Sequence, residues 1–331
     1  MFYQLLLRFA LLVCISATGL FGAEVAKPKS QPRVASAAPL WVTRSVAAPR
    51  VTHHVFASAS VKADVSYHLY RPAAYGTDAN RRFPVVYWLH GAGGGLPGIP
   101  GVAKRFDEAI ESGKLPPCLV VFVNGLEMGM YVDWSDGSAP VESMICRDLL
   151  PHVDATYRTI AKREGRLLDG FSMGGYGSAR LGFKHPELFR AISIVGAGPL
   201  QSELKSTPRA SRLQAEDLLR RVFGGDQTIF RKASPLNLAE RNAKKIAQGS
   251  LVRMVIGDKD ETFGNNADFH RQLESLGIPH SWTVVPGAGH DPDRVFDSLG
   301  NKNWAFYRQA FADTLSKTDA SRLDAEKARP N

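Results

Sequence analysis

A serine between glycines is the residue of this chain best placed to do chemistry. The run Gly170-Phe171-Ser172-Met173-Gly174 ends the apolar segment RLLDGF and leads into a helical pattern without an intervening loop. A sharp turn from strand to helix strains the serine backbone and exposes its hydroxyl, while flanking glycines avoid Cβ clashes. The pattern predicts that Ser172 is a nucleophile. A plain glycine-rich turn is the alternative, because GxSxG alone is a weak signal.

A serine nucleophile needs an imidazole to accept its proton, and that imidazole needs a carboxylate to orient it. Of the nine histidines, only His290 follows a buried-type strand, SWTVV, through a glycine-rich turn, so we predict that it is the base. Asp260 follows the apolar run LVRMVIG and is the favoured acid, with Asp258 and Glu261 as alternatives. The chain between Asp260 and His290 has room for a loop, a helix and a strand, which places both side chains at neighbouring strand ends.

Two backbone N–H groups are expected to form an oxyanion hole. Met173 follows the nucleophile and normally supplies one of them. Ala92 is the first choice for the other and Gly91 the second, because both lie in a glycine-rich run directly after the strand PVVYWL. A phosphate-binding loop is disfavoured here, since neither GxGxxG nor GK[ST] spacing is present.

The loop with Tyr131 and Trp134 follows the predicted strand CLVVFVN and should end on the same side of the sheet. These side chains could form an apolar wall for an acyl group or an aromatic platform for a sugar. The alternative is that Trp134 simply packs beneath the loop.

The spacing of apolar residues predicts the elements that position these groups. VTHHVFASASVKADVSYHLYRP alternates apolar and polar residues, as an antiparallel pair does, whereas PVVYWLH, CLVVFVN, RLLDGFS, AISIVG and LVRMVIG resemble buried parallel strands. Helical patterns separate these runs. We therefore predict an α/β fold, a doubly wound and mostly parallel sheet with an antiparallel N-terminal edge. Residues 198–248 are polar and helix-prone, and they predict a cap-like insertion above the carboxyl ends of the strands.

The chain ends predict an exported protein. Residues 1–26 have the short basic start and apolar core of a signal peptide, with an uncleaved membrane anchor as the alternative. Residues 27–50 are predicted to be a linker, 51–313 the catalytic domain, and 314–331 a flexible tail. The expected location is secreted or periplasmic, with no stable membrane insertion after cleavage.

The composition excludes several function classes. The 331 residues are 44% hydrophobic and 22% charged, unlike a disordered, collagenous or membrane-embedded chain. Residues 1–50 carry more than half of the net charge of +9, so the folded body gives little reason to expect a nucleic-acid partner. Cys118 and Cys146 are predicted to be two separate buried thiols, although one disulfide is arithmetically possible. No clustered Cys/His pattern suggests a metal.

Four runs together resemble a known family: PVVYWLHGAGG, SMICRDLLPHVDATYRT, RLLDGFSMGGYGSARLGFKHPELFRAISIVG and PGAGHD. Across most of residues 65–295 the chain resembles the esterase family of α/β-hydrolases that includes esterase D, feruloyl esterases, enterochelin esterases and mycolyltransferases. The resemblance implies a triad of Ser172, Asp260 and His290, ester hydrolysis through an acyl-enzyme, and no cofactor or metal. The signal-like N-terminus departs from the cytosolic esterase D members, and the cluster GDKDE leaves the acid ambiguous.

The sequence therefore predicts a serine esterase that acts on exported esters, such as feruloyl or acetyl esters of carbohydrates. Two alternatives remain open. An acyltransferase of the mycolyltransferase type would pass the same acyl group to an alcohol, and a non-catalytic binding module would keep only the fold.

Overall fold

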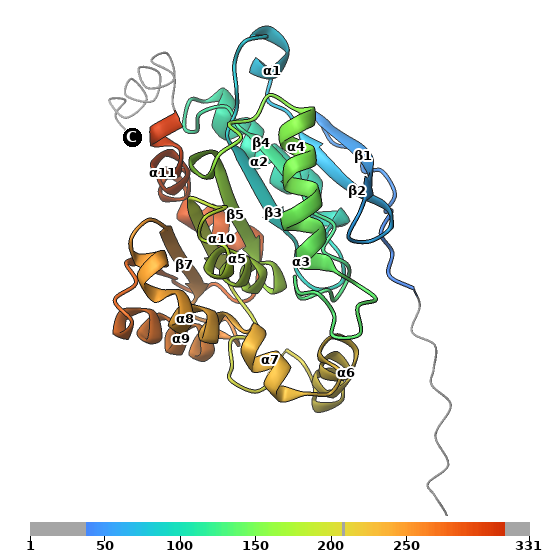
Figure 1. Ribbon diagram of the computed structural model, residues 1–331. Coiled ribbons are helices and arrows are strands. Elements are labelled where there is room, and N and C mark those ends of the chain that lie inside the picture. Colours follow the sequence, from blue (N-terminus) through green and yellow to red (C-terminus); the bar gives the residue numbers. More distant parts are fainter. Residues whose placement is uncertain (1–37, 207–208, 315–331) are drawn as a thin grey trace, which may run out of the picture. The chain divides into compact units, whose positions relative to one another are not determined.

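In the computed structural model, which describes residues 38–206 and 209–314, eight strands form one sheet in the order β1-β2-β4-β3-β5-β6-β7-β8 (Figure 1). β2 pairs antiparallel with β1 and with β4, and every other neighbouring pair is parallel. The strands from β1 to β8 span Val51–Ser58, Ala63–Tyr70, Val85–Leu89, Leu119–Phe122, Arg166–Phe171, Ala191–Val195, Leu251–Gly257 and His280–Val285. This topology confirms the predicted α/β class and its antiparallel edge.

Helices cover both faces of the sheet. In chain order, α1 to α11 span Ala74–Thr77, Ile99–Glu111, Val141–Ser143, Leu150–Thr156, Met173–Lys184, Arg212–Phe223, Gln227–Ala233, Pro235–Ala247, Phe263–Ser275, Pro292–Leu299 and Asn301–Ala310. Short 3₁₀ or π turns span Leu96–Gly98, Met144–Leu149, Arg163–Gly165 and Ala312–Thr314. Adjacent residues of β5 show the two faces, because Leu168 packs with α4, α5, α8 and α9 whereas Leu167 packs with α2 and α11. Strands buried on both sides explain the continuous apolar runs of the sequence.

The predicted insertion at 198–248 is too long. Its earlier part includes α6, which lies over the pocket described below. Its later part is α8, which packs against α5 and α9 through a buried apolar face that includes Leu238 and Ile246. α8 is therefore the crossover helix between β6 and β7, and the expectation that it belongs to a cap is wrong. Its many charged residues lie on the exposed face of an amphipathic helix.

The folded unit also begins earlier than predicted. Residues from Pro39 onward belong to it, and the Trp41 side chain is buried. The Trp41 carbonyl accepts hydrogen bonds from the backbone N–H of Ser66 at 2.8 Å and from Asn124 Nδ2 at 2.8 Å. Residues 39–50 therefore pack on the sheet rather than forming a linker. The predicted signal peptide at 1–26 and the tail beyond residue 314 lie outside the described residues.

The two cysteines of the described chain are separate free thiols, as predicted. Cys118 is fully buried, and burial raises the pKa of its thiol well above the usual range. Burial and the nearby Glu142 carboxylate raise the pKa of Cys146 to about 12. Both thiols are therefore protonated at neutral pH and are weak nucleophiles.

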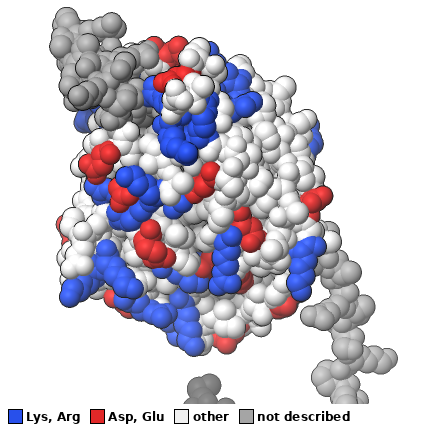
Figure 2. Space-filling view, turned by 45° about the horizontal axis from the view of Figure 1, so that its top comes forward, with Lys and Arg blue, Asp and Glu red and all other residues white. Residues whose placement is uncertain are grey.

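Charges of both signs are intermixed on the face that Figure 2 shows. Several of the surface charges form ion pairs, such as Arg105 of α2 with Asp293 of α10 at 3.0 Å. This intermixing agrees with the near balance of charge in the folded body. A nucleic-acid surface, in contrast, concentrates positive charge on one face or along one helix.

Candidate active site

The turn between β5 and α5 presents Ser172 in a strained backbone conformation. Ser172 has φ 63° and ψ −120°, a combination that side-chain-bearing residues rarely adopt. A Cβ on Gly174 would lie 1.9 Å from the Leu89 carbonyl oxygen, and a Cβ on Gly170 would lie 2.5 Å from the same atom. Both glycines are therefore required for β3 and the turn to approach so closely. The strand-turn-helix context expected of a nucleophile is present.

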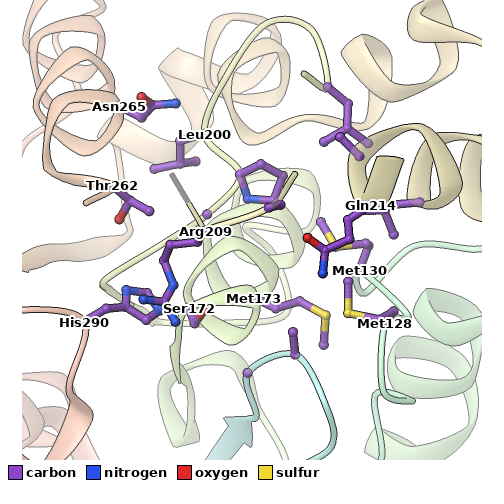
Figure 3. A pocket seen from close by; sticks show the side chains of 18 of the residues that line it. Met128, Met130, Ser172, Met173, Leu200, Arg209, Gln214, Thr262, Asn265 and His290 are labelled. Carbon is purple, nitrogen blue, oxygen red and sulfur yellow. Dashed lines mark hydrogen bonds between the residues drawn. The ribbon is translucent and has the colours of Figure 1, made fainter. Parts of the chain in front are cut away.

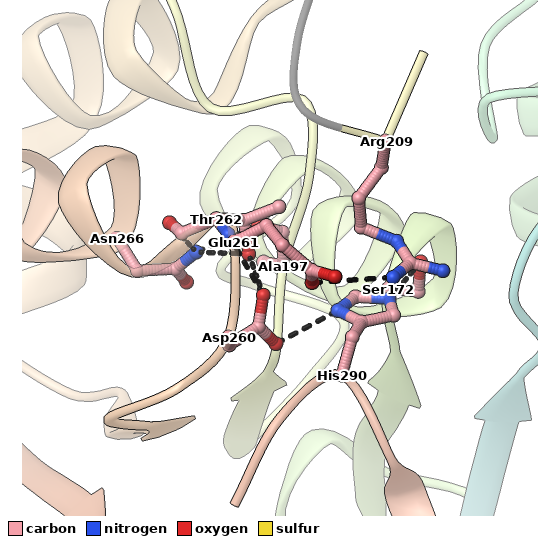
Figure 4. A network of polar contacts seen from close by, with 8 residues as sticks. All are labelled: Ser172, Ala197, Arg209, Asp260, Glu261, Thr262, Asn266 and His290. Carbon is pink, nitrogen blue, oxygen red and sulfur yellow. Dashed lines mark hydrogen bonds and ion pairs between the residues drawn. The ribbon is translucent and has the colours of Figure 1, made fainter.

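Ser172, His290 and Asp260 form a hydrogen-bonded chain (Figure 4). His290 Nε2 lies 2.9 Å from Ser172 Oγ, and His290 Nδ1 lies 2.7 Å from Asp260 Oδ2. Asp260 Oδ1 accepts hydrogen bonds from both the backbone N–H and the hydroxyl of Thr262, each at 2.8 Å. The Asp260 carboxylate is thus fixed on both oxygens, and Nδ1 is the nitrogen of His290 that donates to it.

The environment of Asp260 keeps its carboxyl group ionised. Burial by itself would raise the pKa of Asp260, but hydrogen bonds from His290 and Thr262 outweigh it and leave the pKa below its ordinary value. An ionised carboxylate favours the His290 tautomer with a proton on Nδ1. Nε2 is then free of a proton and able to accept one from Ser172.

The structure separates Asp260 from the two other candidate acids. Asp258 Oδ1 accepts the backbone N–H of Gly287 at 2.7 Å, which shapes the turn before His290. Glu261 forms an ion pair with Arg209 at 3.3 Å. Asp260 is the one of the three that hydrogen-bonds His290.

Asp260, Glu261 and His290 also bring potential metal ligands within 4.8 Å of one another. Both nitrogens of His290 are already hydrogen-bonded, one to Ser172 and one to Asp260. A metal ion would have to break the contacts that orient the imidazole, so these residues fit proton transfer better than metal binding.

The expected oxyanion groups border the same pocket as Ser172. Ala92 and Met173 both line it, and a Cβ on Gly91 would lie 3.4 Å from Ser172 Cβ. Met173 is the first residue of α5, so its N–H is at the positive end of the helix dipole. Developing negative charge beside Ser172 would therefore meet backbone donors.

Sequence reasoning missed the role of His90 beside the glycine-rich loop that contains Gly91 and Ala92. The backbone N–H of Gly125 donates to His90 Nε2 at 3.1 Å, so the proton of the ring is on Nδ1, which lies 2.7 Å from the Gly91 carbonyl oxygen. Burial lowers the pKa of His90 and keeps the ring neutral. His90 therefore holds the Gly91 peptide in place. A buried histidine at the end of a strand, next to a glycine run, is the signal that could have found it.

The expectation that Tyr131 and Trp134 contact substrate is wrong. Tyr131 is fully buried, and its hydroxyl donates to the carbonyl oxygen of His90, the residue before Gly91, at 2.8 Å. Trp134 does not border the pocket and packs against the core with Arg221 over its ring. Met128 and Met130 of the same loop line the pocket instead.

A buried ion cluster connects α5, the helix that follows Ser172, to the loop that carries Met128, Met130 and Tyr131. Glu142 of α3 forms ion pairs with Arg180 and Lys184 of α5, each at 2.6 Å, and contacts His185 at 2.8 Å. Arg180 Nη1 in turn donates to the Tyr131 carbonyl oxygen at 2.8 Å. Burial alone would raise the pKa of Glu142, but these partners hold it well below the usual range.

We expect Glu142→Gln to lower the free energy of unfolding by about 3 kcal/mol at pH 7, because it leaves the buried Arg180 charge without its partner. Because the folded pKa of Glu142 is depressed, its contribution is complete above the unfolded pKa of about 4.3 and is lost as the pH falls toward the folded pKa. Denaturant unfolding at pH 7 and pH 3.5 measures both effects. Glu187→Gln is the matched control, since Glu187 is exposed and meets His185 at 3.4 Å; an equal loss in both variants would contradict the prediction.

The pocket over Ser172 has a volume of about 760 Å³. Figure 3 shows Ser172 and His290 at its base and side chains of several elements around it. The residues that line it include Met128, Met130, Phe171, Met173, Leu200, Arg209, Gln214, Ala215, Asp217, Leu218, Arg221, Thr262 and Asn265. α6 therefore closes one side of the pocket and the start of α9 the other, and the volume suits a small-molecule ligand.

Comparison with known proteins adds to this geometry. Residues 58–318 match the family described as "Putative esterase". The chain belongs to this family. It has the α/β-hydrolase fold, and the resemblance drawn from the motifs is confirmed.

Two curated relatives and one solved structure illustrate the similarity. The chain is 26% identical over 272 residues to "Esterase Rv1288" of Mycobacterium tuberculosis, covering 75% of this chain and 57% of the relative. It is 28% identical over 155 residues to "Endo-1,4-beta-xylanase/feruloyl esterase" of Xylanibacter ruminicola, covering 43% of this chain and 21% of that relative. The chain thus spans just over half of the first relative. A solved "ferulic acid esterase" superposes with a TM-score of 0.65 at 21% identity, over 79% of this chain and 98% of that one.

Proposed function

We propose that this chain is a carboxylic ester hydrolase that works through an acyl-enzyme on Ser172, with His290 as the general base and Asp260 as the group that orients His290. The hydrogen-bonded chain from Asp260 through His290 to Ser172 carries the proposal, because it joins a nucleophile to a base and the base to its orienting acid.

Each step uses an atom already in place. His290 Nε2 accepts the Ser172 proton as Oγ attacks the ester carbonyl carbon, and the N–H groups of Met173 and Ala92 donate to the resulting oxyanion. The imidazolium then gives that proton to the leaving alcohol oxygen, and the acyl group remains on Ser172. Water attacks the acyl-enzyme while His290 Nε2 accepts its proton, and the imidazolium then returns that proton to Ser172 Oγ as the bond to the acyl carbon breaks and the acid leaves.

The proposed substrates are exported esters of hydroxylic compounds such as carbohydrates. Support for the carbohydrate side comes from the feruloyl esterase relative, whose name joins that activity to a xylanase. Two relatives are named for feruloyl and acetyl esters, so these are the acyl groups that the comparisons suggest. Secretion or periplasmic location rests on the signal-like residues 1–26. In the part of the chain that the structure describes, no helix has the length and apolarity needed to span a membrane.

Covalent trapping tests this mechanism directly. Purified protein is incubated with a fluorophosphonate, and intact-mass and peptide mass spectrometry locate the adduct. We expect one adduct on Ser172 in the wild type and in Ser112→Ala, an exposed serine at the end of α2, and none in Ser172→Ala. A folded wild-type protein that stays unlabelled, or an adduct elsewhere, would contradict the proposal. Adding glycerol during p-nitrophenyl acetate turnover separates hydrolysis from acyl transfer, since transfer forms glyceryl acetate in place of acetate.

A further inference from the structure

The pocket has two chemically different ends on either side of Ser172. In Figure 3, Met128, Met130 and Met173 lie on one side of Ser172, and Thr262 and Asn265, with Leu200 beside them, lie on the other, beyond His290. We call the first side the methionine end and the second the polar end. An ester has two halves, so the ends differ in which half each can accept.

The position of His290 decides which half goes where. In the proposed mechanism its Nε2 must hand a proton to the leaving alcohol oxygen, so the alcohol lies on the His290 side of Ser172. Asn265 borders the pocket on that side and offers an amide to a hydroxylic alcohol, whereas the neighbouring Thr262 hydroxyl is bonded to Asp260. The acyl group therefore lies at the methionine end.

α6 completes the methionine end with apolar surface. Gln214, Leu218 and Arg221 recur at helical spacing, so they share the face of α6 that lines the pocket, together with Ala215 and Asp217. Two of the polar contacts on this face are made within the protein, while Arg221 Nε is buried without a hydrogen-bond partner. Gln214 Oε1 accepts the backbone N–H of Ser211 at 2.8 Å, and Arg221 pairs with Asp217 at 3.5 Å.

The residue types at this end suit a flexible chain better than a planar ring. Methionine is unbranched and polarisable, and it adapts to the contour of an alkyl group. Phe171 is the one Phe, Tyr or Trp side chain among the lining residues, and its ring packs 4.6 Å from that of His290. The 760 Å³ volume is also much larger than an acetyl group needs.

We propose that the methionine end, formed by Met128, Met130, Met173, Ala215 and Leu218, is a subsite for unbranched aliphatic acyl chains of about six to ten carbons. The proposal rests on the serine mechanism proposed for this site. It predicts that esters of these longer chains are preferred over both acetyl and feruloyl esters.

A chain-length series measures this preference. We expect kcat/KM for p-nitrophenyl esters, kept below their micelle-forming concentrations, to rise about twofold to fourfold per added methylene from acetate to octanoate, because each buried methylene leaves water. The octanoate should also exceed p-nitrophenyl ferulate by at least about tenfold. A maximum at acetate, or a ferulate faster than octanoate, would overturn the subsite. Failure of Ser172-dependent turnover on every ester would instead overturn the mechanism.

Neighbouring leucines of α6 provide matched variants. Both pack on the core, but Leu218 lines the pocket and Leu219 does not. Leu218→Ala should lower the octanoate-to-acetate ratio of kcat/KM about fivefold or more, and Leu219→Ala should leave the ratio unchanged. Met128→Ala, a change in a half-buried loop residue, makes the same comparison if the helix variant does not fold. Equal ratios in Met128→Ala, Leu218→Ala and wild type would overturn the assignment.

Discussion

Replacing Ser172 by alanine is expected to lower kcat/KM for p-nitrophenyl acetate by about 10⁴-fold or more, to the level that the oxyanion hole and substrate binding sustain alone. Ser172 Oγ is the atom that faces His290 Nε2 at 2.9 Å, and alanine removes it without changing the backbone requirement at φ 63°. Steady-state hydrolysis of purified wild type and variant, corrected for spontaneous hydrolysis, measures the loss.

The same variant should fold normally, which separates lost chemistry from lost structure. Alanine retains the Cβ of Ser172, and the Ser172 backbone N–H still donates to the Val195 carbonyl oxygen at 3.0 Å. Circular dichroism and thermal unfolding should therefore match wild type. A folded Ser172→Ala protein that keeps more than about one hundredth of the activity would rule out Ser172 as the nucleophile.

The parts of this fold that sequence could predict are those set by local chain geometry. Buried parallel strands show as apolar runs, and the glycines around Ser172 mark a turn in which Leu89 O leaves no room for a side chain. His290 was found for the same reason, because a glycine-rich turn follows the strand before it. These signals lie within a few residues of the groups they position.

The features that the sequence did not predict depend on contacts between segments far apart in the chain. Tyr131 follows a strand at the catalytic side, as substrate-binding aromatics do, yet its hydroxyl satisfies the His90 carbonyl group 41 residues earlier in the chain. Residues 39–50 have no strand or helix periodicity because they pack on the sheet through single contacts such as those of Trp41. α8 carries enough charge to resemble a cap, but the face that it turns to α5 is apolar. No local pattern distinguishes these cases.

The choice among Asp258, Asp260 and Glu261 was open for a related reason. All three follow β7 within a few residues, so each could reach the strand ends. The outcome depends on the turn after Gly257, where an added Cβ would lie 2.0 Å from the Ala288 carbonyl oxygen. This close approach brings the two loops together and directs Asp260 to His290, while Asp258 meets the Gly287 N–H.

Asp260→Asn is therefore expected to lower kcat/KM by about 10⁴-fold while leaving the fold intact. The N–H and hydroxyl of Thr262 both donate to Asp260 Oδ1, so the asparagine oxygen stays there and its NH₂ group faces His290 Nδ1. Nδ1 must then accept a hydrogen bond, which moves the imidazole proton to Nε2 and blocks proton acceptance from Ser172.

Asp258→Asn is the matched control for this tautomer argument. Its amide oxygen can still accept the Gly287 N–H, and it does not contact His290, so kcat/KM should stay within about threefold of wild type. Parallel kinetics on p-nitrophenyl acetate with thermal unfolding of both variants makes the comparison. If Asp258→Asn lost activity as Asp260→Asn is expected to, and Asp260→Asn kept it, Asp258 would be the acid. Loss in Asp260→Asn alone means that the carboxylate of Asp260, and not that of Asp258, holds the imidazole proton on Nδ1 of His290.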